Sequence, residues 1–423
     1  MDLFPKGVVL PFQKGAALHH KIENYQVTAA VRVPLVRLDI QAPVPSLSFE
    51  ENAALAQGSV LYREEGELPV LSPVAGTFVG TVVLQHPQYG KLLCAEILPT
   101  EGDEELLPVS SVEDLSADDI LHIAREAAIY DELDGVPLAE KLVAWQLPTN
   151  DPIAPSCVLV ADATENDVFG SAAWAILDEE PKEALIGLLL AAKALHFNRC
   201  HIATMLPKAR RRALYKAINR ENVYTVGDEY PITEYAGDRD EVFRIGIQAC
   251  LALAKAVLYG QKSTHVVLTV AGDGVTASRN LRVPYGSEIG DVISACNTAS
   301  NTLVVLGDAM TGVACHDIHT PLLPGTTTLL VMLDRETKVA GPCIGCGRCA
   351  AVCHAKLLPY EIVRRAENMH YERLRRLTAD LCDGCGVCSY VCPADRDVAA
   401  GVLRAGESTG PVFLKWGDED DEA

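Results

Sequence analysis

Eight of the chain's fourteen cysteines lie in two copies of one short motif. Each copy has the spacing C-x2-C-x2-C-x3-C. The first copy contains Cys343, Cys346, Cys349 and Cys353, and the second contains Cys382, Cys385, Cys388 and Cys392. This spacing is the bacterial pattern for cubane iron–sulfur clusters. A loop with two residues between thiolates reaches three corners of a cube, and the fourth corner has to come from elsewhere. The sequence therefore predicts two [4Fe-4S] clusters.

The two motifs are expected to share their ligands, because in a two-cluster site the fourth cysteine of each motif ligates the other cluster. We predict one cluster held by Cys343, Cys346, Cys349 and Cys392, and a second held by Cys382, Cys385, Cys388 and Cys353. Glycines inside both motifs suit a backbone that turns sharply. A pair of zinc sites is the alternative, but zinc sites usually combine two close cysteines with a distant second pair. The sequence indicates no catalytic side chain and no residue for an organic cofactor.

Composition and charge limit the classes of protein to which the chain can belong. Its 423 residues, 49% of them hydrophobic, predict a globular chain of several domains. A formal charge of −21 argues against a nucleic-acid partner or an anionic membrane partner. The start has no export signal, and the most apolar run, 184–192, is too short for a transmembrane segment. We expect a cytoplasmic protein. Partner proteins could also hold it at the inner face of a membrane.

The other six cysteines are scattered singly among apolar residues. We interpret them as buried hydrophobic side chains in a reducing compartment rather than as disulfides. They are Cys94, Cys157, Cys200, Cys250, Cys296 and Cys315.

Residues 1–110 have the pattern of a small β domain. The segment 31–40 alternates around Pro34, 58–62 is short and apolar, and 73–80 is typical of a turn followed by a strand. Such strands suggest a hammerhead-like β domain of the kind that carries lipoyl groups. Because this part of the sequence has no Asp-Lys-Ala or similar hairpin tip, we interpret it as a docking or scaffold domain.

Residues 111–260 alternate predicted helices and strands. Helices are expected at 116–130, with Ser116 as the cap, and at 182–197, 208–219 and 241–259, with strands at 157–161 and 201–205. This alternation predicts a Rossmann-like α/β domain with a parallel sheet. The basic run from Lys208 to Arg212 is either a docking site for an acidic redox partner or a solvated helix face, and the second is the commoner case.

Residues 261–334 predict a β-grasp domain. Strands at 265–270 and 280–283 precede a helix at 287–296, and strands at 302–306 and 326–333 follow it. This order is that of a ubiquitin-like grasp. Residues 272–277 match the dinucleotide fingerprint G-x-G-x-x-A, but a returning strand follows them in place of a helix. We therefore interpret them as a hairpin turn.

Residues 335–403 contain both cysteine motifs and predict a two-cluster ferredoxin-like domain. Between the motifs, 357–377 is predicted to form one helix, whose apolar side covers the clusters while its arginines face water or a partner. A final helix is expected at 397–405, and residues 404–423 are expected to form an acidic tail.

The order of these units resembles the C subunit of Rnf-type electron-transport complexes and its soluble relatives, such as the electron-transfer protein associated with proline reductase. The resemblance extends over about residues 28–403 and rests on the cysteine motifs and on segments 268–274, 282–286 and 306–312. In that family a hammerhead-like domain precedes a flavin- and NADH-binding domain, a soluble-ligand-binding β-grasp and a two-cluster ferredoxin domain. The resemblance implies the same order of domains here.

The chain departs from this family at the flavin site. Where the family has Gly-Gly-Ala-Gly-Phe-Pro-Thr against the flavin phosphate, this chain has Asp131, Glu132 and Asp134, whose carboxylates would repel a phosphate. Lys141 is near enough to neutralise one of them. Of the family's Asn-Ala-Ala-Glu-Cys-Glu-Pro, only Ala163 and Glu165 are in place. The Gly-x-Glu-Lys-Gln expected after 230–231 is missing. We therefore expect a degenerate nucleotide-binding-like domain that binds neither FMN nor NADH.

A further departure is His354, which stands where the first motif of the family has proline. It leaves all eight cysteines intact. Its expected effect is on solvent access or on an N–H contact of a cluster, both of which tune the reduction potential.

The function that these patterns favour is the relay of single electrons between protein redox partners, such as a ferredoxin, a flavoprotein or a reductase, through two [4Fe-4S] clusters. One alternative is an NADH-oxidising flavoenzyme subunit with an altered flavin site. Another is a redox-sensing or assembly scaffold, although the sequence resembles no DNA-binding module. We favour an electron-transfer subunit of an oxidoreductase system over a stand-alone enzyme, with no nucleic-acid partner.

Overall fold

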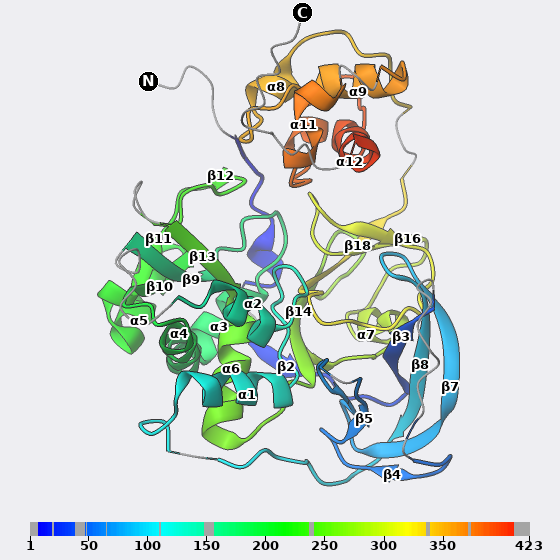
Figure 1. The fold of residues 1–423 in the computed structure, drawn as a ribbon. Coiled ribbons are helices and arrows are strands. Elements are labelled where there is room, and N and C mark those ends of the chain that lie inside the picture. The colour runs from blue at the N-terminus through cyan, green and yellow to red at the C-terminus, as the bar shows by residue number, and fades with distance from the viewer. Residues whose placement is uncertain are drawn as a thin grey trace, which may run out of the picture. The chain divides into compact units, whose positions relative to one another are not determined.

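The computed structural model describes residues 7–18, 21–38, 47, 49–64, 66–109, 111–147, 156–236, 241–335, 339–370 and 374–409. The chain divides into two compact units. The first unit contains Met1–Pro11, Asp228–Thr233 and Arg335–Ala423, and the second contains Phe12–Gly227 and Glu234–Asp334. Several separate sheets and many helices make the fold a mixed α/β fold (Figure 1).

The second unit begins with a β region. Its four-stranded sheet has the order β3 (Val31–Arg37), β8 (Gly90–Pro99), β7 (Gly76–His86) and β4 (Ala54–Leu55), and β5 (Val60–Tyr62) pairs with β6 (Val70–Leu71). In β3 buried residues alternate with more exposed ones, because successive side chains point to opposite faces of a sheet. Val31, Phe78 and Ile97 pack together in the core of this region. The long β7–β8 hairpin is prominent in Figure 1.

Four parallel strands form the centre of the second unit. Their order is β11 (Val223–Thr225), β10 (Cys200–Thr204), β9 (Cys157–Ala163) and β13 (Glu241–Gly246). Every residue of β9 is buried, as expected for a parallel strand that is covered on both faces. The parallel pairing agrees with the alternation of helices and strands in the sequence.

Helices pack around this sheet. Figure 1 shows α1 (Ala117–Glu126), α4 (Pro181–Leu195) and α6 (Ile247–Tyr259) side by side, and these three helices contact one another. The helices α2 (Leu138–Trp145), α3 (Ala172–Glu179) and α5 (Lys208–Ile218) also belong to this region, with short 3-10 turns at Lys14–Ala16 and Arg220–Asn222. Ser116 caps α1 as predicted, in a capping box with Asp119.

A six-stranded sheet completes the second unit. Its order is β17 (Val313–Cys315), β16 (Thr302–Leu306), β18 (Thr328–Leu333), β14 (His265–Ala271), β15 (Arg279–Pro284) and β2 (Ile22–Asn24). α7 (Ile289–Ser294) contributes Val292 to the core beside Leu268. β14 and β15 pair antiparallel, so the segment 272–277 is followed by a returning strand, as predicted.

The first unit is mostly helical. It contains α8 (Arg348–Ala351), α9 (Pro359–Glu367), α11 (Val387–Tyr390) and α12 (Val398–Thr409), with 3-10 turns at Arg375–Leu377 and Ala379–Leu381. Ile362 of α9 and Val402 of α12 pack into its core. Two short strands, β1 (Val8–Val9) and β12 (Glu229–Tyr230), pair antiparallel in the same unit, and Tyr230 Oη donates to the carbonyl oxygen of Cys385 at 2.9 Å.

Two expected helices differ from the structure. The helix expected at 241–259 is wrong over its first part, because residues 241–246 pair with β9 as strand β13. The helix expected at 357–377 is also wrong. α9 ends at Glu367, and Met369 then has a positive φ of 53°, which a helix does not accommodate. Residues 410–423 of the expected acidic tail lie outside the described residues.

No helix in the described parts of the chain is long and apolar enough to cross a membrane. All fourteen cysteines lie in described segments and carry free thiols. Of the six that stand outside the motifs, five are buried and Cys200 is partly exposed. The five buried side chains are small hydrophobic groups, as the sequence predicts, whereas Cys200 departs from the prediction in being partly exposed.

Candidate metal centre

The eight motif cysteines line two cavities in the first unit. The first cavity, about 230 Å³, is lined by Cys343, Cys346, Cys349 and Cys392. The second cavity, about 20 Å³, is lined by Cys353, Cys382, Cys385 and Cys388. Each cavity thus takes three cysteines from one motif and one cysteine from the other.

Glycines shape the two loops in the same way. Gly345 and Gly347 in the first motif have φ of 68° and 73°, and Gly384 and Gly386 in the second have φ of 74° and 80°. Other residues rarely adopt this left-handed conformation. The last glycine of each pair leads into a one-turn helix, α8 or α11. These helices hold the third cysteine of each motif, Cys349 or Cys388, in a buried position.

The donor atoms bear on the choice between a cluster and a zinc ion. Four thiolates at about 2.3 Å from a tetrahedral zinc lie about 3.8 Å from one another. In the described part of the chain, the one group of three ligand atoms within 4.8 Å of one another is His354, Asp383 and Cys385. No three cysteine sulfurs of those same segments are that close together. The donor set of each cavity is four thiols, three of them from one C-x2-C-x2-C loop, which is the pattern of a [4Fe-4S] cluster and not the usual pattern of a zinc site.

His354 connects the two motifs. Its Nε2 lies 2.9 Å from Oδ2 of Asp383, and Oδ1 of Asp383 accepts the Cys385 N–H at 3.2 Å. His354 and Asp383 both line the second cavity. The histidine that replaces the family's proline therefore lies beside one cysteine set and not the other.

The acidic loop after α1 lies at the start of α6, in the second unit. Oε1 and Oε2 of Glu132 accept the N–H groups of Gln248 and Ala249 at 2.6 Å and 3.0 Å. Oδ1 of the neighbouring Asp131 accepts the N–H of Gly246 at 2.9 Å. Burial, and then the charge of Asp131, raises the pKa of Glu132 to about 8. The chain's own carboxylates therefore occupy the helix N-terminus, which is a position where anions bind.

Lys141 compensates two of the three acids in this loop, where the sequence predicts one. Its Nζ lies 2.5 Å from Oδ2 of Asp131 and 2.7 Å from Oδ2 of Asp134. Asp131 is fully buried and Asp134 is exposed. The loop is thus held by an ion pair at one end and by the α6 backbone at the other.

Lys14 lies at the carboxyl end of the parallel sheet. Its Nζ donates to the carbonyl oxygens of Asp167 and Gly170 at 2.6 Å and 2.7 Å. The carboxylate of Asp308 accepts the N–H of Gly170 in the same place. Parallel sheets commonly bind nucleotides at this edge. Here a buried lysine from the start of the chain packs into it, and no local sequence signal predicts that contact.

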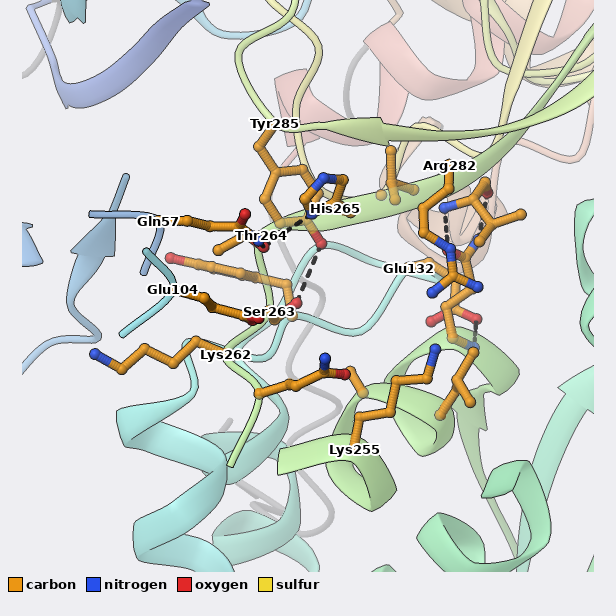
Figure 2. Close-up of a pocket in the computed structure, with 18 residues that line it drawn as sticks. Gln57, Glu104, Glu132, Lys255, Lys262, Ser263, Thr264, His265, Arg282 and Tyr285 are labelled. Atoms are coloured by element: carbon orange, nitrogen blue, oxygen red, sulfur yellow. Dashed lines mark hydrogen bonds between the residues drawn. The ribbon is translucent and has the colours of Figure 1, made fainter. Parts of the chain in front are cut away.

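A cavity of about 210 Å³ lies beside α6 in the second unit (Figure 2). Lys255 and Arg282 extend toward each other in Figure 2, and both bind Glu180, at 2.5 Å and 2.6 Å. Burial, together with these two cations, lowers the pKa of His265 in its wall to about 4. Sequence reasoning missed this cavity because its residues come from distant segments and match no motif.

Comparisons with known proteins match both the cysteine-containing region and longer parts of the chain. Residues 342–396 match the family model of the 4Fe-4S dicluster domain. The C subunit of the ion-translocating oxidoreductase complex of Rhodobacter capsulatus is 31% identical over 195 residues, which are 45% of this chain and 36% of that protein. The C subunit of the Na(+)-translocating ferredoxin:NAD(+) oxidoreductase complex of Acetobacterium woodii is 25% identical over 399 residues, 88% of each chain.

Other relatives are longer than this chain. The C subunit of the ion-translocating oxidoreductase complex of Pseudomonas aeruginosa is 25% identical over 406 residues, 88% of this chain and 51% of that protein. The chain thus spans about a third to a half of the length of some relatives and most of another. An NAD+-reducing [NiFe]-hydrogenase in the air-oxidized state superposes with a TM-score of 0.47 at 16% identity, over 69% of this chain and 61% of the other. The chain is a homologue of the Rnf-type C subunits and has a 4Fe-4S dicluster domain at residues 342–396.

Proposed function

We propose that this chain is an iron–sulfur electron-transfer protein that relays single electrons between protein partners through two [4Fe-4S] clusters. The observation that carries the proposal is the pair of cavities, each of which is lined by four cysteines. Such clusters supply one-electron chemistry at potentials that depend on charge, hydrogen bonds and exposure. No substrate chemistry is needed from the side chains.

The proposed ligands are divided between the cavities. Cys343, Cys346, Cys349 and Cys392 would hold the cluster of the first cavity, and Cys353, Cys382, Cys385 and Cys388 that of the second. Val363 lines the first cavity and Val402 the second. These apolar side chains exclude water from one side of each site.

The finer domain assignment belongs to the same proposal. We assign residues 1–110 to a hammerhead-like β domain, 111–260 to a degenerate nucleotide-binding-like domain, 261–334 to a β-grasp domain, 335–403 to a two-cluster ferredoxin-like domain and 404–423 to an acidic tail. The parallel sheet and the strand order around β14 and β18 support the second and third assignments. The dicluster match at 342–396 supports the fourth.

We further propose that neither FMN nor NADH binds the α/β region. The Glu132 carboxylate, which already accepts two N–H groups at the start of α6, supports this. The names of the relatives, which are subunits of oxidoreductase complexes, support protein partners, and one of those names contains ferredoxin. We propose a cytoplasmic location, with contact to a membrane only through such partners.

Metal analysis after anaerobic reconstitution tests the proposal. The full chain is expected to hold about eight irons and eight acid-labile sulfides, because each cubane uses four thiolates. Cys392→Ala should impair the cluster of the first cavity and Cys353→Ala that of the second, as resolved by Mössbauer and electron paramagnetic resonance spectra. Cys200→Ala, outside both motifs, is the matched control. Iron near four per chain in the unmodified protein, or stoichiometric zinc, would contradict the proposal.

A further inference from the structure

The two cysteine motifs are equivalent in spacing but differ in charge. Ile344 in the first motif corresponds to Asp383 in the second, and Arg348 corresponds to Val387. These positions lie inside the shared C-x2-C-x2-C core, so each pair lies at the same place relative to its cysteines. All four residues line their cavities. The two sites therefore have similar loops and opposite local charges.

Arg348 is a positive charge in the lining of the first cavity. That cavity is also lined by Arg364, Arg396 and Glu367. Arg364 pairs with Glu361 at 2.6 Å and Arg396 pairs with Glu367 at 2.5 Å. In the described residues no acidic side chain is within ion-pair distance of Arg348, which is exposed. Glu361 is shared with Arg365 at 2.7 Å, so Arg348 and the side chains of these pairs together carry a formal charge of two positive.

Asp383 has the opposite effect at the second cavity. It is the one carboxylate in that lining, which contains no lysine or arginine, so the aspartate, glutamate, lysine and arginine side chains there sum to one negative charge. Its Oδ1 also accepts the N–H of Cys385 at 3.2 Å, so that N–H is directed to a carboxylate and not to sulfur. Ile344, at the matching position of the first motif, has no acceptor atom. Both effects of Asp383 disfavour added negative charge.

We infer that the cluster of the first cavity has the higher reduction potential, and that Arg348 and Asp383 set the order. The inference rests on the proposed function, because it takes the two ligand sets as given. Reduction adds one negative charge to a cluster, which a nearby guanidinium stabilises and a nearby carboxylate destabilises. Two cysteines of the first cavity, Cys343 and Cys346, are exposed. Solvent exposure also influences the reduction potential of a cluster.

Exchanging the paired residues tests the inference. The full reconstituted chain is titrated potentiometrically and followed by electron paramagnetic resonance, and Cys346→Ser identifies the step that belongs to the first cavity. Two separate one-electron steps are expected, the upper one from the first cavity. Arg348→Val and Ile344→Asp should each lower the upper step, and Asp383→Ile and Val387→Arg should each raise the lower step. Arg348→Lys should leave the upper step nearly unchanged.

A matched control is Arg376→Gln, which removes an exposed arginine that lines neither cavity and should move neither step. Coincident steps in the unmodified protein, a lower step assigned to the first cavity, or an Arg348→Val variant that moves only the other step would each overturn the inference. Failure of the proposed function looks different. In that case the unmodified chain would hold fewer than about eight irons, so that two cubane steps would not be observed.

Discussion

Glu132 and Gln248 join the acidic loop to the first turn of α6: Oε1 of Glu132 accepts the Gln248 N–H at 2.6 Å. Its other oxygen accepts the next N–H along the helix, that of Ala249. The free N–H groups and the dipole of a helix N-terminus stabilise an anion. In this chain the carboxyl group of Glu132 takes that position and accepts both N–H groups.

The first prediction is that the purified protein binds neither FMN nor NADH. A phosphate that approached α6 would have to displace Glu132 and would meet Asp131 beside it. Titration calorimetry with each ligand should give no micromolar binding. The absorption spectrum of anaerobically purified protein should have a broad cluster band without flavin bands. Micromolar binding of either ligand, or flavin bands in the spectrum, would instead support the flavoenzyme alternative.

The second prediction concerns the Lys141–Asp131 ion pair, in which Nζ lies 2.5 Å from Oδ2. Lys141→Met leaves the fully buried Asp131 carboxylate without its cation, and we expect it to lower the free energy of unfolding by about 3–5 kcal/mol. Urea denaturation measures this loss. Adding Asp131→Asn to Lys141→Met should recover part of it, because the buried charge is then absent.

Lys193→Met is the control for this variant, since Lys193 is an exposed lysine on α4. Its effect should stay within about 0.5 kcal/mol. A Lys141→Met protein as stable as the unmodified chain would mean that Asp131 takes up a proton at little cost when its partner is removed.

Local sequence patterns predict the features that depend on short-range geometry. The spacing of the cysteines singles out the residues that line the two cavities, because a cluster loop is built within a dozen residues. The cap at Ser116 is predictable for the same reason, since a capping box spans four residues. Buried strands such as β9 are recognised from their continuous apolar runs.

The features that the sequence does not predict depend on contacts between distant segments. β13 forms a strand because it pairs with β9, about eighty residues earlier, and its apolar pattern alone also fits a helix. Lys14 reaches the carbonyl oxygens of Asp167 and Gly170 from the start of the chain. In the sequence Glu132 is only a charge that repels phosphate, because its role as a cap of α6 needs the fold that brings the two together.

The third prediction is a loss of stability in mild acid that depends on His86. This side chain is buried at the end of β7, and its Nδ1 accepts the Gln88 N–H at 3.2 Å, which requires a neutral ring. Burial lowers its pKa from 6.5 to about 4. Between these values the unfolded chain binds more protons than the folded one, so stability falls as the pH falls from 6.5 toward 4.

The His86→Asn variant should reduce that loss by roughly 1–3 kcal/mol, because it removes the titration while Oδ1 can still accept the Gln88 N–H. Urea denaturation at several pH values between 4 and 7 measures the change. Some dependence should remain, since the pKa of His265 is lowered over the same range. The exposed neighbour Gln85 on β7 provides the control, as Gln85→Asn changes no titratable group and should leave the slope unchanged. An unaltered slope in His86→Asn would show that His86 does not titrate as its burial implies.

The last prediction concerns the contact between α4 and α6. Gly187 lies inside α4, and a methyl group added there would overlap the backbone carbonyl of Cys250 in α6. Alanine in place of glycine normally stabilises a helix by about 1 kcal/mol. The overlap is with backbone, which cannot move aside alone, so we expect a steric cost at the upper end of roughly 1–3 kcal/mol to outweigh that gain.

Gly187→Ala should therefore lower the melting temperature measured by circular dichroism. Gly227→Ala, where a methyl group meets nothing within 4 Å, should not lower it. A stabilised Gly187→Ala protein would mean that the two helices separate at little cost.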